Sequence, residues 1–267
     1  MLELYQRDPC QKTLRTRVLA VTTVKKKPAL HLAETILYPG GGGQPCDSGW
    51  ITVPGGGRAA VTRVLKMNGK IYAVLAEDAP VAPGDRIDVE VDWEPRYRNM
   101  RCHTSTHVLN GALAKSVTGY VSEGIEVSED GLAATSRFQG AWPADRETAL
   151  AHIETSNRLI AEGRRVEIVE YGALSDAIAK VGPVYRDPVG LKGPVNIVTI
   201  ARVGSIYRGP VDLKGPVSVV VVEDWDANPC GGTHVRNANE VGPLRLLDFG
   251  PSHIRFALQP YGAIGSA

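Results

Sequence analysis

Cysteine and net charge are both scarce in this sequence of 267 residues. Its four cysteines, Cys10, Cys46, Cys102 and Cys230, are too few for a disulfide scaffold. A formal net charge of +1 excludes a uniformly basic nucleic-acid-binding chain. A local basic surface is still compatible with this composition, because only the charge of the docking surface attracts a polyanion.

Long apolar segments are also missing. No run of eighteen apolar residues is present, so we expect no membrane-spanning helix and no membrane partner. The first residues lack the basic-then-apolar pattern of a signal peptide, which predicts a cytoplasmic protein. Hydrophobic residues make up 43% and charged residues 22%, as in globular proteins, and the length suits one large or two ordinary domains.

The first 92 residues have the pattern of β structure. Asn68-Gly69 separates two apolar segments and predicts a tight hairpin, because such turns need positive φ. Short strands with frequent glycine and proline favour a small β-barrel or sandwich. The predicted strands cover residues 14–24, 29–37, 61–65, 71–75 and 86–92. We expect an N-terminal β-barrel-like domain over residues 1–92.

The pattern changes at Trp93, near the expected domain boundary. Pro95 suits the first turn of a helix, which we expect to continue to about residue 115. The apolar segment 217–222 predicts a central strand of a sheet. Two more helices are predicted over 143–161 and 174–181, and one more strand over 166–171. The expected fold class is α+β, in which residues 93–267 combine an antiparallel sheet with packed helices.

An internal repeat relates residues 184–198 to residues 206–220, with ten of fifteen positions identical. Two copies are too few for a solenoid, so we expect a duplicated strand-turn unit that forms a hairpin. The alternative is a basic finger that contacts a polyanion through Arg186, Lys192, Arg208 and Lys214. The residues do not decide between these two interpretations.

Two short motifs have the spacing of metal ligands. His103 and His107 are four residues apart on a predicted helix, so both imidazoles project from one face. Cys230 and His234 flank two glycines, which predict a tight turn that lets thiolate and imidazole converge. Either pair alone could arise by chance. Together they use three of the six histidines and predict a tetrahedral zinc site.

The rival ligand Cys102 lies one residue before His103, about 100° around the helix, so its side chain should point elsewhere. Four protein ligands normally close a zinc site and make it structural, whereas catalysis needs an open position, a weakly held ligand or a fifth one. The ligand count alone leaves both roles open.

With their flanking residues, these motifs resemble the editing domain of alanyl-tRNA synthetase. They resemble still more the free-standing AlaX proteins, which carry that domain without the synthetase. The resemblance rests on residues 103–107 (His-Thr-Ser-Thr-His) and 230–234 (Cys-Gly-Gly-Thr-His), with their surroundings at 92–100 and 240–247. Residues 38–50 are similar to the glycine-rich motif of the medium-length AlaX type, and the repeat departs from the family as an insertion.

The resemblance implies a trans-editing hydrolase that deacylates mischarged tRNA(Ala) with one Zn²⁺ per chain. The substrate would be chiefly Ser-tRNA(Ala), with Gly-tRNA(Ala) as the second candidate. A synthetic site built for alanine discriminates by only about 1–3 kcal/mol between amino acids whose side chains differ slightly in size. A second, hydrolytic site that removes the wrong amino acid is one solution. The alternatives are a non-catalytic, zinc-stabilised tRNA-binding module and a zinc hydrolase that acts on a small ester without RNA.

The resemblance also implies roles for Thr106, Glu123, Gln44 and residues 40–43. Thr106 would offer a polar partner to the substrate hydroxyl, although threonine in a helix often bonds back to a carbonyl. Glu123 stands where the family often carries glutamine, and it is either a general base or a solvated charge.

Gly40, Gly41, Gly42 and Gly43, with the adjacent Gln44, would admit substrate or tRNA close to the backbone; a plain connecting loop is the alternative. Basic side chains that could meet tRNA are Lys25, Lys26, Lys27, Arg96, Arg98, Arg164 and Arg165.

Overall fold

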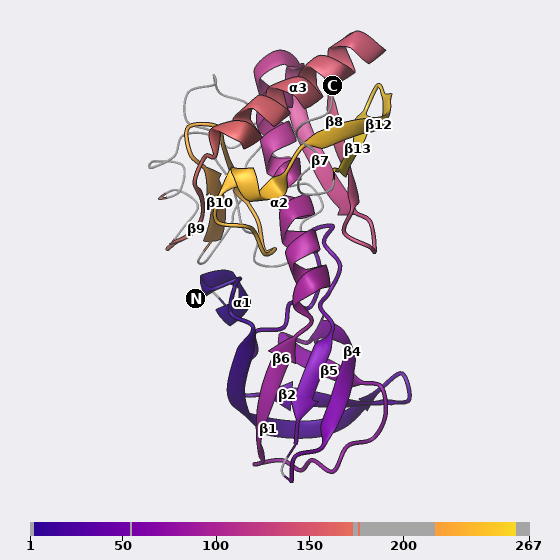
Figure 1. The fold of residues 1–267 in the computed structure, drawn as a ribbon, viewed down its shortest axis with the longest axis vertical. Helices are drawn as coiled ribbons and strands as arrows, with labels where there is room; N and C mark the ends of the chain where they lie inside the picture. Colours follow the sequence, from indigo (N-terminus) through magenta and orange to yellow (C-terminus); the bar gives the residue numbers. More distant parts are fainter. Residues whose placement is uncertain (1–2, 54, 173–175, 177–216, 260–267) are drawn as a thin grey trace.

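The computed structural model describes residues 3–53, 55–172, 176 and 217–259. Figure 1 shows a barrel at one end, an α+β part at the other, and a long helix, α2 (Trp93–Ser116), that runs from the first into the second. This arrangement confirms the expected fold class. The predicted helix 174–181 and nearly all of the repeat lie outside the described residues, so both stay predictions.

The N-terminal part is a closed barrel with the strand order β1-β2-β5-β4-β3-β6, and all its neighbouring strands are antiparallel. Alternate residues of β6, Ile87, Val89 and Val91, are buried in its core, as the sequence pattern indicates. A short helix, α1 (Leu4–Arg7), precedes it. The strands are β1 (Thr13–Val24), β2 (Lys27–Leu32), β3 (Gly49–Thr52), β4 (Arg58–Met67), β5 (Lys70–Leu75) and β6 (Arg86–Val91).

The hairpin between β4 and β5 has the expected turn, because Asn68 and Gly69 have φ values of 49° and 76°. Strand β2 is shorter than predicted and ends at Leu32. The chain leaves the barrel there because its next polar groups bond elsewhere: the Glu34 backbone pairs with the Thr16 hydroxyl, and the carbonyl of Ile36 accepts from Arg96 on α2.

A buried ion pair fastens α2 to the barrel. The guanidinium of Arg96 contacts the carboxylate of Asp47, and both side chains are 0% exposed. Arg96 also donates to the carbonyl of Pro9 over 2.9 Å, so its burial is compensated by several hydrogen bonds. The barrel ends at Val91 and α2 begins at Trp93. The division of the chain into two domains near residue 92 stays a prediction.

The second part contains a four-stranded sheet, ordered β12-β13-β8-β7, and a three-stranded sheet, ordered β11-β10-β9. The apolar strand β10 is central in its sheet, as predicted. Helix α2 packs against strands of both sheets and against α3. The strands are β7 (Thr118–Val127), β8 (Ala133–Ala141), β9 (Val166–Tyr171), β10 (Val217–Val222), β11 (Asp226–Pro229), β12 (Leu244–Gly250) and β13 (His253–Leu258).

Helix α3 (Arg146–Glu162) starts three residues later than predicted, because Asp145 rather than Pro143 defines its N-terminus. The Asp145 carboxylate accepts from the backbone N–H of Thr148 over 2.7 Å. The helix ends at Gly163, whose φ of 70° suits a left-handed cap. A short 3₁₀ helix, η1 (Ala238–Val241), precedes β12. Within the described residues, no helix is both long and apolar enough to cross a membrane.

Candidate metal centre

The middle of α2 is buried on all sides although it is polar. His103 and His107 are 1% and 5% exposed, and the three residues between them, Thr104, Ser105 and Thr106, are also buried. A helix that shows no apolar stripe usually faces water or a polar site. Here both sheets and the loop after β11 cover it, so the polar side chains must find partners inside the protein.

Cys230 and His234 come from the loop that follows β11, and they meet the two helix histidines. A glycine permits this approach: a Cβ atom at Gly232 would lie 2.3 Å from the His103 ring. The loop therefore lies directly against α2, which brings residues that are more than a hundred positions apart in the sequence into one cluster.

The four side chains offer ligand atoms that all lie within 4.8 Å of one another, and all four residues are buried. The Cys230 Sγ atom is 3.4 Å from His103 Nε2 and 3.3 Å from His234 Nε2. Tetrahedral zinc with usual bond lengths would place sulfur and nitrogen ligands about 3.6 Å apart. The residues therefore fit a metal ion in geometry and in donor type, and the cluster could hold one.

Each imidazole of the cluster uses its Nδ1 atom for a partner outside the cluster. The oxygens of a carboxylate and of an amide only accept, so Nδ1 carries the proton in those two pairs and Nε2 keeps its lone pair. The three pairs are His103 with Gln44 Oε1 at 2.7 Å, His107 with Asp226 Oδ2 at 3.0 Å, and His234 with Thr104 Oγ1 at 3.1 Å. These contacts orient the three rings toward one point.

The charges of the cluster favour a thiolate. Burial acts to raise the pKa of Cys230, but the adjacent His103 and His234 outweigh it and hold this pKa well below its usual value. Burial acts to lower the pKa of His107, yet its hydrogen bond to Asp226 raises it to about 9. Burial lowers the pKa of His234 to about 3. A thiolate and neutral imidazoles are the forms that bind metals, so Cys230 and His234 suit a metal ion as they are, whereas metal binding would release a proton from His107.

The glycine run positions Gln44 rather than leaving it in a free loop. All four glycines, Gly40 to Gly43, have positive φ. A Cβ atom at Gly43 would lie 1.9 Å from the carbonyl oxygen of Ile125 on β7, so only glycine fits there. Gln44 is buried, and its amide group also donates to the Thr233 hydroxyl over 2.8 Å. Gln44 therefore contacts the Nδ1 atom of His103, on the side of the ring that faces away from the cluster, and helps to orient this ring.

The other predicted site residues lie in different settings. The Thr106 hydroxyl donates to the carbonyl of His103 over 2.7 Å, the backbone bond that was the alternative interpretation. Glu123 is exposed on β7 and accepts from Gln139 over 2.6 Å, and no contact described for it reaches the cluster. Cys102 is buried away from the cluster, and burial raises its pKa to about 12. The prediction that Arg96 could meet tRNA was wrong, because Arg96 is buried.

Sequence reasoning missed two of the three residues that orient the imidazoles, Thr104 and Asp226. Thr104 lies inside the first motif, between the two helix histidines, where an inward-facing hydroxyl needs a partner. Asp226 lies four residues before Cys230 and is 2% exposed. Its only local signal was an acidic residue beside a metal motif, which is typical of groups that support a histidine ligand.

Comparisons with known proteins relate the chain to translation enzymes. A family described as "Threonyl and Alanyl tRNA synthetase second additional domain" matches residues 217–255, which include Cys230 and His234. The alanine–tRNA ligase of Pyrococcus furiosus is 32% identical over 246 residues, covering 91% of this chain and 24% of that protein. That of Aeropyrum pernix is 32% identical over 252 residues, covering 92% and 24%.

The alanyl-tRNA editing protein AlaX-L of Pyrococcus horikoshii is 28% identical over 248 residues, covering 92% of this chain and 54% of that protein. The chain thus spans about a quarter of the length of the ligases and about half of the length of the editing protein. In each case the similarity extends through both the barrel and the part that carries the cluster.

Proposed function

The chain belongs to the AlaX family of editing-domain proteins, and we propose that it hydrolyses the ester of tRNA(Ala) that carries a wrong amino acid. The substrate of the proposal is chiefly Ser-tRNA(Ala), followed by Gly-tRNA(Ala). The observation that carries it is the buried His–His–Cys–His cluster with oriented imidazoles, in a chain related to alanine–tRNA ligases over nine tenths of its length.

We propose that the cluster holds one Zn²⁺ per chain through His103, His107, Cys230 and His234. When bound, such an ion supplies a Lewis acid that polarises a carbonyl group or a water molecule. The chain's own contribution is to keep the ligands in place. Gln44, Asp226 and Thr104 hold the three rings, which limits the reorganisation that the site would need during the reaction.

In this proposal, Thr106 is the residue that selects serine over glycine and alanine. Its hydroxyl proton is already donated to the carbonyl of His103, so its oxygen is left to accept a hydrogen bond from a substrate. Serine has the hydroxyl donor that this acceptor needs, whereas glycine and alanine lack it. A polar site of this kind discriminates strongly against an analogue that leaves its groups unpaired.

Glu123 is the candidate general base of the proposal, and substitution by glutamine tests that role. A base role predicts that Glu123→Gln lowers the rate constant of ester hydrolysis at least about tenfold and changes its pH profile. A solvated charge predicts an unchanged rate constant and pH profile, because Glu123 is exposed and contacts only Gln139 among its described partners.

The direct experiment compares Ser-, Gly- and Ala-tRNA(Ala) side by side, with the zinc content measured on the same protein sample. The expected order of deacylation rates is serine, glycine, alanine, and the Thr106→Val variant should reduce the preference for serine. Ser-tRNA(Ala) that stays intact after long incubation with zinc-loaded protein would contradict the proposal.

The second candidate is a zinc-stabilised module that binds tRNA without hydrolysis. The four-ligand count favours it, because structural zinc sites are usually closed by four protein ligands. It predicts tRNA binding that weakens with salt while the ester stays intact. The same side-by-side experiment separates the two functions.

A further inference from the structure

A groove beside the metal centre contains an excess of arginine. It is a cavity of about 540 Å³ between α1, β9 and the segment after β11, and His234 is one of its lining residues. Arg7, Arg165 and Arg236 line it together with a single acidic residue, Glu167. Asp8 also pairs with Arg236, so three guanidiniums face two carboxylates, and the groove is positive right next to a predicted zinc ligand.

The arginines of the groove are available to a ligand. Arg165 and Arg236 are 64% and 66% exposed, and they contact Glu167 and Asp8 at 3.1 Å and 2.7 Å. Ion pairs this exposed are weak, so either guanidinium can turn to a stronger anion. Arg7 has no ion pair with any residue in the described part of the chain.

Phosphate is the ligand group that this chemistry fits best. A guanidinium offers a planar fork of donors that matches two phosphate oxygens, and several such forks along a groove follow a phosphodiester chain. The volume lies within the range of about 300–1,000 Å³ that small-ligand pockets have. The half-buried apolar side chains of Ile168 and Val169 also line the groove and offer a surface for the bases.

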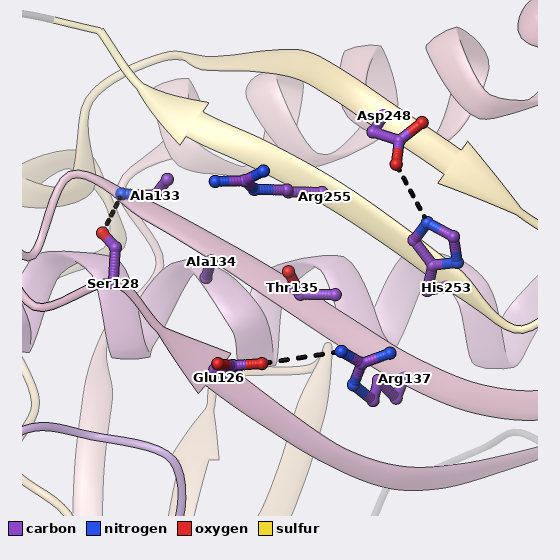
Figure 2. Close-up of a pocket in the computed structure, with 9 residues that line it drawn as sticks. All are labelled: Glu126, Ser128, Ala133, Ala134, Thr135, Arg137, Asp248, His253 and Arg255. Carbon is purple, nitrogen blue, oxygen red and sulfur yellow. Dashed lines mark hydrogen bonds and ion pairs between the residues drawn. The ribbon is translucent and has the colours of Figure 1, made fainter.

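A second cavity shows that this excess is not general. A cavity of about 380 Å³ lies on the face of the four-stranded sheet. Figure 2 shows its lining, in which Arg137 and Arg255 lie among Glu126 and Asp248. Arg137 pairs with Glu126 at 3.5 Å, and the acidic groups equal the arginines in number. None of the four cluster residues lines this cavity. It therefore supplies matched control substitutions.

We propose that the arginine groove binds the phosphates of the nucleotides that precede the aminoacylated ribose of the tRNA. This inference rests on the proposed function, and it gives that function a defined subsite for the RNA strand. With the phosphates in the groove, the terminal ribose ester lies on the side of His234, next to the cluster. The groove then distinguishes an RNA-borne ester from a small free ester, because only the former has phosphates to bind.

The test compares Arg7→Ala/Arg165→Ala with the control Arg137→Ala/Arg255→Ala, using Ser-tRNA(Ala) and an adenosine ester of serine that has no phosphate. The groove variant should raise KM for Ser-tRNA(Ala) about tenfold, with little change in kcat. Log affinity falls with log salt concentration, and each lost phosphate contact on a single strand reduces the magnitude of this negative slope by about 0.7. The control variant should change neither KM nor slope, and Arg7→Lys/Arg165→Lys should restore most of the affinity.

Three results would overturn the inference: an unchanged KM in the groove variant, an equal loss on the adenosine ester, or an equal loss in the control variant. Matching melting temperatures show that both variants are folded. If the wild-type protein leaves Ser-tRNA(Ala) intact, the proposed function fails separately. The groove is then judged by the binding of an uncharged acceptor-stem hairpin, which is weaker in the groove variant if the inference holds and unchanged if it is wrong.

Discussion

Two histidine–aspartate pairs occupy opposite environments in this molecule. His107 and Asp226 lie 3.0 Å apart with side chains 6% and 0% exposed. His253 and Asp248 lie 3.3 Å apart on the sheet face of Figure 2, with side chains 27% and 65% exposed. The same two residue types therefore make the same contact, once inside the protein and once at its surface.

The difference between the two pairs shows which polar contacts fix the orientation of side chains in the site. Water can replace either partner of the exposed pair, so its contact holds neither side chain strongly. Water has little access to the buried pair, and loss of Asp226 would leave Nδ1 of His107 without its acceptor. The hydrogen bond to Asp226 overcomes burial and raises the pKa of His107 to about 9, whereas the exposed bond from His253 only lowers the pKa of Asp248. Burial thus turns an ordinary contact into a constraint on ring orientation.

The largest effect is expected from removing a histidine of the buried cluster. His103→Ala deletes one of four donors, so zinc measured by atomic emission should fall below about a tenth of an equivalent per chain. Deacylation of Ser-tRNA(Ala) should fall at least about 100-fold, because functional metal sites lose 10–100-fold even when only a supporting residue changes. The matched change at the exposed pair, His253→Ala, should leave both quantities as they are. Normal zinc content in His103→Ala would contradict the role of the buried cluster as the metal site.

The next effect concerns ion pairs and extends the comparison to stability. Asp47→Asn leaves the buried guanidinium of Arg96 without its counter-charge and should lower the free energy of unfolding in urea by about 3–5 kcal/mol. The exposed pair of Arg58 with Glu90 is 51% exposed on both sides, so Glu90→Gln should cost less than about 1 kcal/mol. Equal losses in the two variants would contradict the role that we give to burial.

A substitution in the buried His–Asp pair sharpens the comparison directly. Asp226→Asn should weaken zinc affinity about 10–100-fold in a competition with a chelator, because it removes the acceptor that orients His107. The absorption bands of the Co²⁺-substituted protein should shift as well, which a loss of stability alone would not produce. Asp248→Asn is the control, and an affinity loss of the same size there would contradict the prediction.

The smallest effect is expected in the glycine run, where a position packed against β7 and an open position are adjacent. Gly43→Ala introduces a Cβ atom against the carbonyl of Ile125, whereas a Cβ atom at Gly42 would meet no atom within 4 Å. Both changes carry the strain of positive φ, so the difference between them isolates the clash. Urea unfolding should show Gly43→Ala less stable than Gly42→Ala by at least about 1 kcal/mol. Equal stability would show that the loop moves freely away from β7.

The local patterns of the sequence were sufficient for the elements and the metal ligands. Alternation predicts β6, Asn68-Gly69 predicts the hairpin, and a four-residue spacing predicts that His103 and His107 share a face. In each case the physical cause acts over a few residues, so it leaves a period or a turn signal in the sequence.

The supporting contacts of the cluster could not be predicted in this way. Asp226 meets His107 across 119 positions, and Gln44 meets His103 across 59. Such pairs depend on how the barrel, α2 and the loop after β11 pack together, and no local period encodes that packing. The burial of Arg96 was missed for the same reason, because its partner Asp47 lies on the segment between β2 and β3, 49 positions away.

The most direct test of the central claim is a zinc titration of the metal-free protein, followed by deacylation of Ser-tRNA(Ala). If the buried cluster is the editing centre, activity rises linearly with added zinc and reaches a plateau at one equivalent per chain. In the same titration, Asp226→Asn needs a higher free zinc concentration, while Asp248→Asn follows the wild type. Full activity in protein with no measurable metal, or none in protein that carries one zinc per chain, would contradict the claim.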